Sequence, residues 1–158
     1  MANTQAMTTS FMGELMTATH NFGTAPVRAS GATDSFKGAL YLTSATVNAS
    51  TTAYSASNEV SGTNYVAGGV AVTFGTPPTA TNSSATAGVA FVTPSASITY
   101  TNVTLTTAFD AVLIYNSTQS NKAVSVHTFG SQTVTAGTFT LTMPSNTTST
   151  ALLRLATT

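Results

Sequence analysis

Few residues in this chain could carry out chemistry, and they are scattered along the sequence. The carboxylates fall in four different predicted elements: Glu14, Asp34, Glu59 and Asp110. None shows the local pairing that is typical of general acid–base catalysis or of a hard-cation site. His20 follows a predicted helix and His127 lies in a predicted strand, where a lone histidine usually serves as a satisfied core or interface group. The chain has no cysteine, which excludes thiolate metal sites and cysteine nucleophiles.

Sequence motifs for phosphate binding or for an activated serine are also absent. The glycines form neither a G-x-x-x-x-G-K-[ST] nor a G-x-G-x-x-G pattern, and no G-x-S-x-G elbow occurs. A Ser/His/Asp arrangement assembled by the fold stays open, because the chain has 18 serines. The residues therefore predict a protein that is not an enzyme and that holds no cofactor and no metal.

The composition points to a subunit of an assembly. Charged residues make up only 5% of the 158 residues and the net charge is zero, while 35 threonines supply hydroxyl groups in their place. Soluble monomers normally keep a charged surface and a net charge away from zero, because neutral surfaces associate. We expect a homo-oligomer or a subunit bound permanently to another protein. A hydroxyl-rich soluble domain is the alternative.

Nucleic acid and membrane are disfavoured as partners. The basic residues are isolated from one another: Arg28, Lys37, Lys122 and Arg154. They form no stripe that could neutralise several phosphates together. No run of about 18 apolar residues occurs, and the first residues lack the basic and apolar regions of a secretory signal. We expect synthesis in the cytosol without membrane insertion.

One amphipathic helix is predicted over residues 10–20, with Ser10 as its N-cap. Its apolar residues recur at three- and four-residue steps: Phe11, Met12, Leu15 and Met16. An isolated helix of this length is poorly stable, so the stripe needs burial against its own domain or against a neighbour. We favour the neighbour narrowly, which makes these four residues the candidate assembly interface.

The remaining chain is predicted to be all-β. After a loop or linker over residues 21–34, short alternating or continuously apolar segments are bounded by Gly, Pro and polar residues. The predicted strands span residues 36–43, 70–74, 89–93, 97–105, 108–115, 123–129, 138–143 and 151–156. About eight short strands of this kind predict a β-sandwich or jelly-roll. We divide the chain into an N-terminal helix with a linker or arm, residues 1–34, and a β-sandwich domain, residues 35–158.

Several phrases carry a resemblance to a known family. They are THNF at 19–22, FKGALY at 36–41, NEVSGTNYVAGG at 58–69, AVLIYN at 111–116 and VSVHTFG at 124–130. In this order they resemble a family of small Thr- and Gly-rich virion structural proteins of tailed bacteriophages, and the resemblance covers nearly the whole chain. It implies a location in the virion and brings no catalytic residues with it.

The resemblance and the composition together suggest a capsid decoration, or cement, protein. Such a protein binds the outer shell, with the major capsid protein or another virion protein as its partner, and stabilises contacts between capsomers. A tail, neck or fibre component of the virion is the alternative. A second alternative is a carbohydrate-binding β-sandwich module, for which five tyrosines are possible platforms: Tyr41, Tyr54, Tyr65, Tyr100 and Tyr115. The absence of tryptophan lowers the support for it.

Overall fold

The protein is an all-β chain with one short helix, as the sequence predicts. The computed structural model describes residues 2–16, 18–22, 33–81 and 88–156. The elements in chain order are β1 (Ala6–Met7), α1 (Thr9–Met16), β2 (Phe36–Leu42), β3 (Val70–Val72), β4 (Thr79–Ala80), β5 (Val89–Val92), β6 (Ile98–Asn116), β7 (Lys122–Leu141) and β8 (Leu153–Ala156). Within the described residues, the strands hold several times as many residues as the eight-residue helix.

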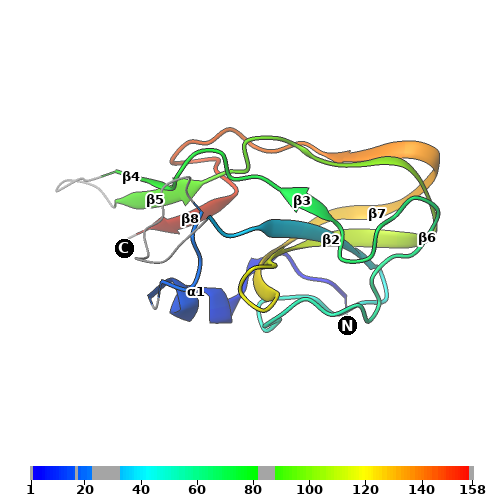
Figure 1. Ribbon diagram of the computed structural model, residues 1–158, viewed down its shortest axis with the longest axis horizontal. Coiled ribbons are helices and arrows are strands. Elements are labelled where there is room, and N and C mark those ends of the chain that lie inside the picture. The colour runs from blue at the N-terminus through cyan, green and yellow to red at the C-terminus, as the bar shows by residue number, and fades with distance from the viewer. Residues whose placement is uncertain (1, 17, 23–32, 82–87, 157–158) are drawn as a thin grey trace.

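The strands form two antiparallel sheets. The larger sheet has the order β1-β7-β6-β2-β3, and the smaller one has the order β4-β5-β8. Figure 1 shows the smaller sheet and α1 at one end of the molecule and the long strands β6 and β7 extending to the other end. The centre of the larger sheet is buried on both faces, because residues 111–116 of β6 are all buried. The predicted central strand over residues 108–115 is therefore confirmed.

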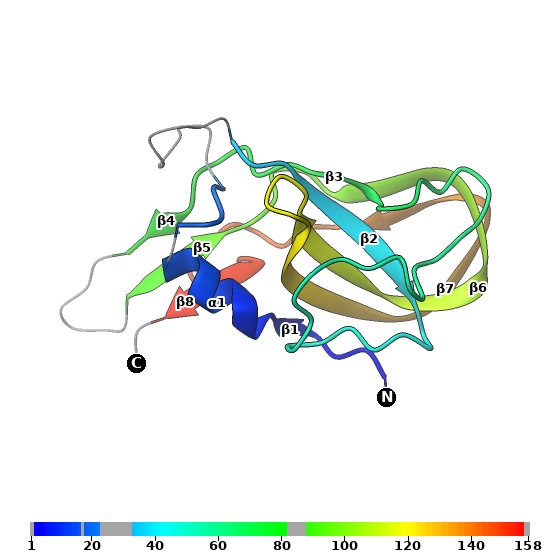
Figure 2. The same ribbon diagram turned by 60° about the horizontal axis from the view of Figure 1, so that its bottom comes forward.

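The hairpin of β6 and β7 replaces four predicted strands. Residues 97–105 and 108–115 join into β6, and residues 123–129 and 138–143 join into β7. The register between β6 and β7 shifts at five places, and three residues on these strands have positive φ: Asn102, Gly130 and Ala136. Such bulges bend a strand without ending it. The hairpin thus curls back over itself, as the two views show (Figures 1 and 2). The breaks between the predicted strands within β6 and within β7 are irregularities in one continuous pairing.

Two apolar layers pack against the larger sheet. The larger layer lies where the curled hairpin faces β2, and there the Tyr100 hydroxyl donates a hydrogen bond of 2.7 Å to the Gly38 carbonyl. The other layer covers the opposite face. It is closed by the covering loop, which we define as residues 43–69, through Ala45, Val47 and Tyr54. The covering loop makes only isolated bridges.

The N-terminal segment, residues 3–22 with residue 17 outside the description, belongs to this same fold. β1 pairs with β7, and the Thr8 hydroxyl contacts the carbonyl oxygens of Ala123 and Val124. The helix begins at Thr9, so Ser10 is not its N-cap, and it ends at Met16 because Ala18 adopts a left-handed conformation with φ of 53°. The segment is packed as part of the domain that we predicted to start at residue 35, and it is not an arm.

Candidate functional site

The predicted interface residues have different positions in the structure. Phe11 is 2% exposed and lies in the main core beside Phe22, with ring centroids 5.8 Å apart. Leu15 is partly buried against the same core, whereas Met12 is 47% exposed. The side chain of Met16 lies outside the described part. The prediction that this stripe docks on a neighbour is wrong for Phe11, because its own domain buries it.

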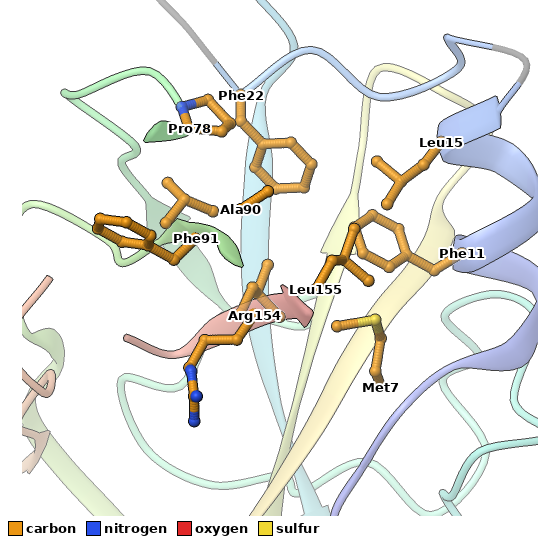
Figure 3. Close-up of a pocket in the computed structure, with 11 residues that line it drawn as sticks. Met7, Phe11, Leu15, Phe22, Pro78, Ala90, Phe91, Arg154 and Leu155 are labelled. Carbon is orange, nitrogen blue, oxygen red and sulfur yellow. The ribbon is translucent and has the colours of Figure 1, made fainter. Parts of the chain in front are cut away.

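The helix nevertheless forms one wall of an apolar groove. The groove has a volume of about 70 Å³ and lies between α1, Phe22 and the small sheet (Figure 3). The residues that line it are almost all apolar: Met7, Phe11, Leu15, Phe22, Pro78, Ala90, Phe91, Val92, Leu153, Arg154 and Leu155. Leu155 is 41% exposed, although it is a large aliphatic residue. Such a hollow can accept an apolar side chain from a partner, and burial of that side chain would contribute about 1.5–3 kcal/mol.

Among the described residues that line the groove, Arg154 at its rim is the only charged one. Its guanidinium points away from the apolar side chains (Figure 3). No described side chain forms an ion pair or a hydrogen bond with it. β8, which carries Arg154 and Leu155, pairs with β5 and is one of the two edge strands of the small sheet. The groove therefore lies beside a strand edge that presents exposed backbone groups, which is a common feature of docking surfaces.

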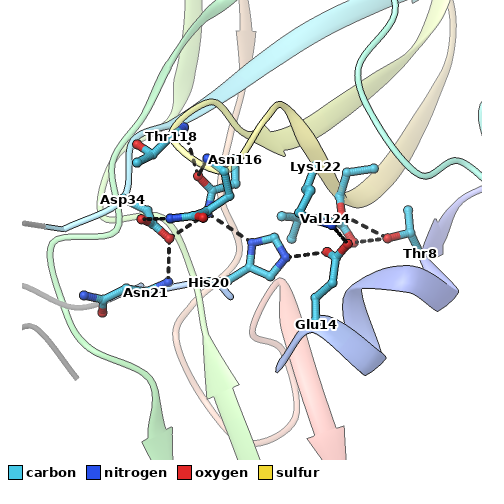
Figure 4. A network of polar contacts seen from close by, with 11 residues as sticks. Thr8, Glu14, His20, Asn21, Asp34, Asn116, Thr118, Lys122 and Val124 are labelled. Atoms are coloured by element: carbon cyan, nitrogen blue, oxygen red, sulfur yellow. Dashed lines mark hydrogen bonds and ion pairs between the residues drawn. The ribbon is translucent and has the colours of Figure 1, made fainter. Parts of the chain in front are cut away.

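A buried polar network fastens the wall that α1 provides (Figure 4). His20 Nε2 is 2.7 Å from Glu14 Oε2, and Lys122 Nζ is 2.6 Å from Glu14 Oε1. On its other side, His20 Nδ1 is 3.1 Å from Asn116 Nδ2, and that amide also donates a hydrogen bond of 2.8 Å to Asp34 Oδ2. The network connects α1 and His20 to the turn between β6 and β7 and to the start of β2.

Burial shifts the pKa values in this network. Burial alone would raise the pKa of Glu14, but hydrogen bonds from Lys122 and His20 and their positive charge hold the pKa below its ordinary value. Burial lowers the pKa of His20, and the hydrogen bond and charge of Glu14, with the charge of Asp34, only partly offset this effect. His20 is thus neutral and Glu14 is ionised near neutral pH.

A second, partly buried carboxylate organises the tyrosines. Glu59 accepts hydrogen bonds from the hydroxyls of Tyr54 and Tyr65 and from the backbone N–H of Gly68. Tyr54 stacks on Tyr115 and Tyr65 stacks on Tyr100, with ring centroids 4.7 and 5.9 Å apart.

These contacts bear on the carbohydrate alternative. Tyr41, Tyr100 and Tyr115 are buried, and their hydroxyls donate hydrogen bonds to backbone carbonyl oxygens. The tyrosines therefore serve internal packing, and they do not form the exposed platform that a carbohydrate-binding module would use.

One serine and one histidine come together on β7. Ser125 Oγ lies 2.9 Å from His127 Nε2, and burial lowers the pKa of His127 to about 4. Ser125 is 1% exposed, and no described carboxylate is bonded to this pair. The pair lacks the third member and the access to substrate that nucleophilic catalysis requires.

The described residues were also compared with the requirements of a metal site and of a membrane-spanning helix, and the sequence with known proteins. Among the described residues, no three His, Cys, Asp or Glu side chains are placed to hold one metal ion. In that same part of the chain, no helix is long and apolar enough to cross a membrane. Comparison of the chain with protein-family models, with curated proteins and with solved structures found no match.

Sequence reasoning found one wall of the groove and missed the other. The stripe of α1 was recognised from its helical spacing, but the small sheet with Phe91 and Leu155 was not placed opposite it. A weak signal was available, because residues 151–156 were predicted as a strand that begins with the apolar run Ala151-Leu152-Leu153. The contact between His20 and Asn116 joins residues 96 positions apart, and no local sequence pattern predicts it.

Proposed function

We propose that this protein is a non-enzymatic virion structural protein, a capsid decoration protein that docks on the shell through the apolar groove beside α1. The observation that supports the proposal is the groove itself, an apolar hollow with exposed Leu155 at an open strand edge, on a chain with almost no charge. In a shell each contact is repeated many times, so a modest area per subunit is sufficient for stable attachment. The groove would accept an apolar side chain of the major capsid protein.

A tail, neck or fibre component remains the alternative within the same class. The groove would serve equally well for contacts with those parts of a virion, because the chemistry of the contact is the same. Localisation of the chain in an electron-microscopy map of the intact particle distinguishes the two. Density on the outer shell supports a decoration protein, and density at the tail or neck overturns that assignment.

The docking itself is tested by substitution in the groove. Leu155→Asp places a charge at the exposed apolar edge, and we expect it to abolish binding to particles that lack the protein. The matched control is Val66→Asp, because Val66 is 67% exposed but lies in the covering loop outside the groove. Equal binding of both variants would contradict the groove as the docking surface. The wild-type complex should also resist moderate salt, because apolar contacts are little affected by ionic screening.

A further inference from the structure

We propose that His20 is an acid-sensitive lock on the N-terminal segment: the neutral imidazole links α1 to Asn116 at the end of β6, and protonation of His20 breaks this link and loosens the segment. The lock concerns this chain alone and does not require the docking partner. Its consequence for the groove, described below, rests on the proposed function.

The hydrogen bonds of Asn116 determine which nitrogen of His20 carries the proton. Asn116 Oδ1 accepts hydrogen bonds of 3.1 Å from the backbone N–H groups of Thr118 and Gln119, which identifies it as the oxygen. The other terminal atom is therefore Nδ2, which can only donate. Because Nδ2 lies 3.1 Å from His20 Nδ1, that ring nitrogen must be the unprotonated acceptor. The proton of the neutral ring is then on Nε2, which donates to Glu14.

A second proton on His20 has no acceptor in this arrangement. It would have to bind at Nδ1, where it would face the N–H groups of Asn116. Asn116 cannot turn its amide to offer oxygen, because its oxygen holds the two backbone N–H groups and its nitrogen also bonds Asp34. Protonation thus replaces a hydrogen bond by two opposed donors in a buried site.

The charged groups around His20 come from three elements and act in opposite directions. Glu14 on α1 and Asp34 before β2 favour the imidazolium, while Lys122 at the start of β7 disfavours it. Lys122 Nζ also lies 2.6 Å from Glu14 Oε1, and its positive charge therefore weakens the attraction of Glu14 for the imidazolium. Burial of His20, whose side chain is fully enclosed, opposes the charged form and outweighs the two carboxylates.

The lock controls an apolar contact as well as a polar one. The His20 ring lies 4.9 Å from the Phe11 ring and 6.2 Å from the Phe22 ring. When the imidazolium separates from Asn116, the segment that carries these rings loses its link to β6, and the pairing of β1 with β7 and the bond from Lys122 to Glu14 are left to hold it. Phe11 and Phe22 line the groove, so loosening of the segment in acid would disturb the docking surface and weaken attachment to the partner.

The sign of the pH dependence follows from the lowered pKa of His20. The folded state binds the proton less tightly than the unfolded chain, so the locked state is fully stable above the unfolded pKa of about 6.5. This stability is lost as the pH falls from that value through the lower folded pKa. Loosening of the segment is therefore expected in weak acid.

The experiment uses the full chain in solution. Nitrogen NMR of the histidine rings should show His20 as the Nε2–H form at pH 7.5, titrating below 6.5. Hydrogen exchange, corrected for its intrinsic pH dependence, should show residues 6–20 losing protection in weak acid while residues 109–116 stay protected. A proton on Nδ1 at pH 7.5, or titration of His20 at or above 6.5, would overturn the proposal.

Two variants assign the effect, since the chain has only two histidines. His127→Phe leaves His20 as the sole imidazole, and the acid loss of protection should persist. His20→Phe keeps an aromatic ring beside Phe11 but cannot titrate, and the difference in protection between neutral and weakly acidic solution should vanish. An acid loss that remains in His20→Phe would also overturn the lock. If the lock operates but Leu155→Asp still binds particles, only the docking proposal fails.

Discussion

Two long segments with little sheet structure are fastened to the same five-stranded sheet, each through a partly buried glutamate, but by different chemistry. Glu14 fastens the N-terminal segment through an ionised lysine and a histidine. Glu59 fastens the covering loop through two tyrosine hydroxyls and one backbone N–H. Among the first set of partners, His20 can gain a proton in weak acid, because its pKa is lowered from the ordinary value of 6.5. The tyrosine partners of Glu59 keep their protons, because their pKa values are raised.

The difference explains which end of the molecule can respond to its surroundings. Burial and Glu59 together raise the pKa values of Tyr54 and Tyr65, so both stay protonated donors at any physiological pH. The pKa of His20 is lowered by burial, so this residue gains a proton only in acid, and it holds the wall of an apolar groove. The covering loop is therefore a permanent closure, whereas the N-terminal segment is a conditional one.

The largest expected effect on stability comes from removing the ring of Phe11, which packs the N-terminal segment into the core. Phe11→Ala deletes a ring that is fully enclosed by the core, and such changes cost about 3–5 kcal/mol of unfolding free energy. Met12→Ala is the matched control, because Met12 is the next residue of the same helix and is half exposed; it should change stability by no more than about 0.5 kcal/mol. Chemical denaturation measures both. A similar small change in the two variants would show that the segment is held by its polar network alone.

A smaller loss of stability should test how firmly the covering loop is held against β2. Gly69 in the covering loop has a φ of 74°, and a Cβ there would lie 1.7 Å from the Gly38 carbonyl oxygen. Gly69→Ala should cost more than about 2 kcal/mol, because it adds a backbone collision to the left-handed strain of about 1–2 kcal/mol. Gly130 has a similar φ of 78°, but nothing lies within 4 Å of its Cβ position. Gly130→Ala should thus show the strain alone. Equal losses in thermal or chemical denaturation would mean that the loop moves away from β2 at little cost.

The smallest expected effect is the contribution of Glu14 to the free energy of unfolding, which should depend on pH. Glu14→Gln should cost about 1 kcal/mol at pH 7, a figure reduced by the partial exposure of its partner Lys122. The pKa of Glu14 is lowered in the folded state, so its contribution is present above pH 4.5 and is lost as the pH falls through the folded pKa. The difference from the wild-type protein should therefore shrink in acid. Denaturation at a series of pH values measures it, and a difference that grows toward acid would contradict the ion pairs described here.

The sequence predicted the kind of structure better than its connections. The alternation around Ile98 and the continuous apolar run before Asn116 correctly indicated a half-buried strand and a doubly covered one. The segment around Gly130 and Ala136 was left between two predicted strands, but it is part of β7, with irregular pairing to β6. A residue with positive φ is compatible with a turn and with a bulge, and only pairing with the opposite strand decides between them. The two-residue strands β1 and β4 were missed, because two residues carry no periodicity.

The candidate site was predicted in part for a similar reason. Helical spacing identified Phe11 and Leu15 as one apolar stripe, and both line the groove. The spacing carries no information on what covers the stripe, so the choice of a neighbour over the protein's own core was wrong for Phe11. His20 was expected near the end of a helix, and its actual partner Asn116 is the last residue of the distant strand β6.

By itself the sequence determined that this chain folds as β-structure with almost no charge. Threonine and other β-branched residues favour pleated strands locally, and composition is independent of how the chain folds. Only the tertiary structure decided that α1 closes its own core, that the small sheet with Leu155 forms a groove against it, and that Asn116 selects the neutral form of His20. Those features depend on contacts between residues far apart in the chain. Their energies arise from burial and from hydrogen-bond geometry, which exist only once the strands have paired.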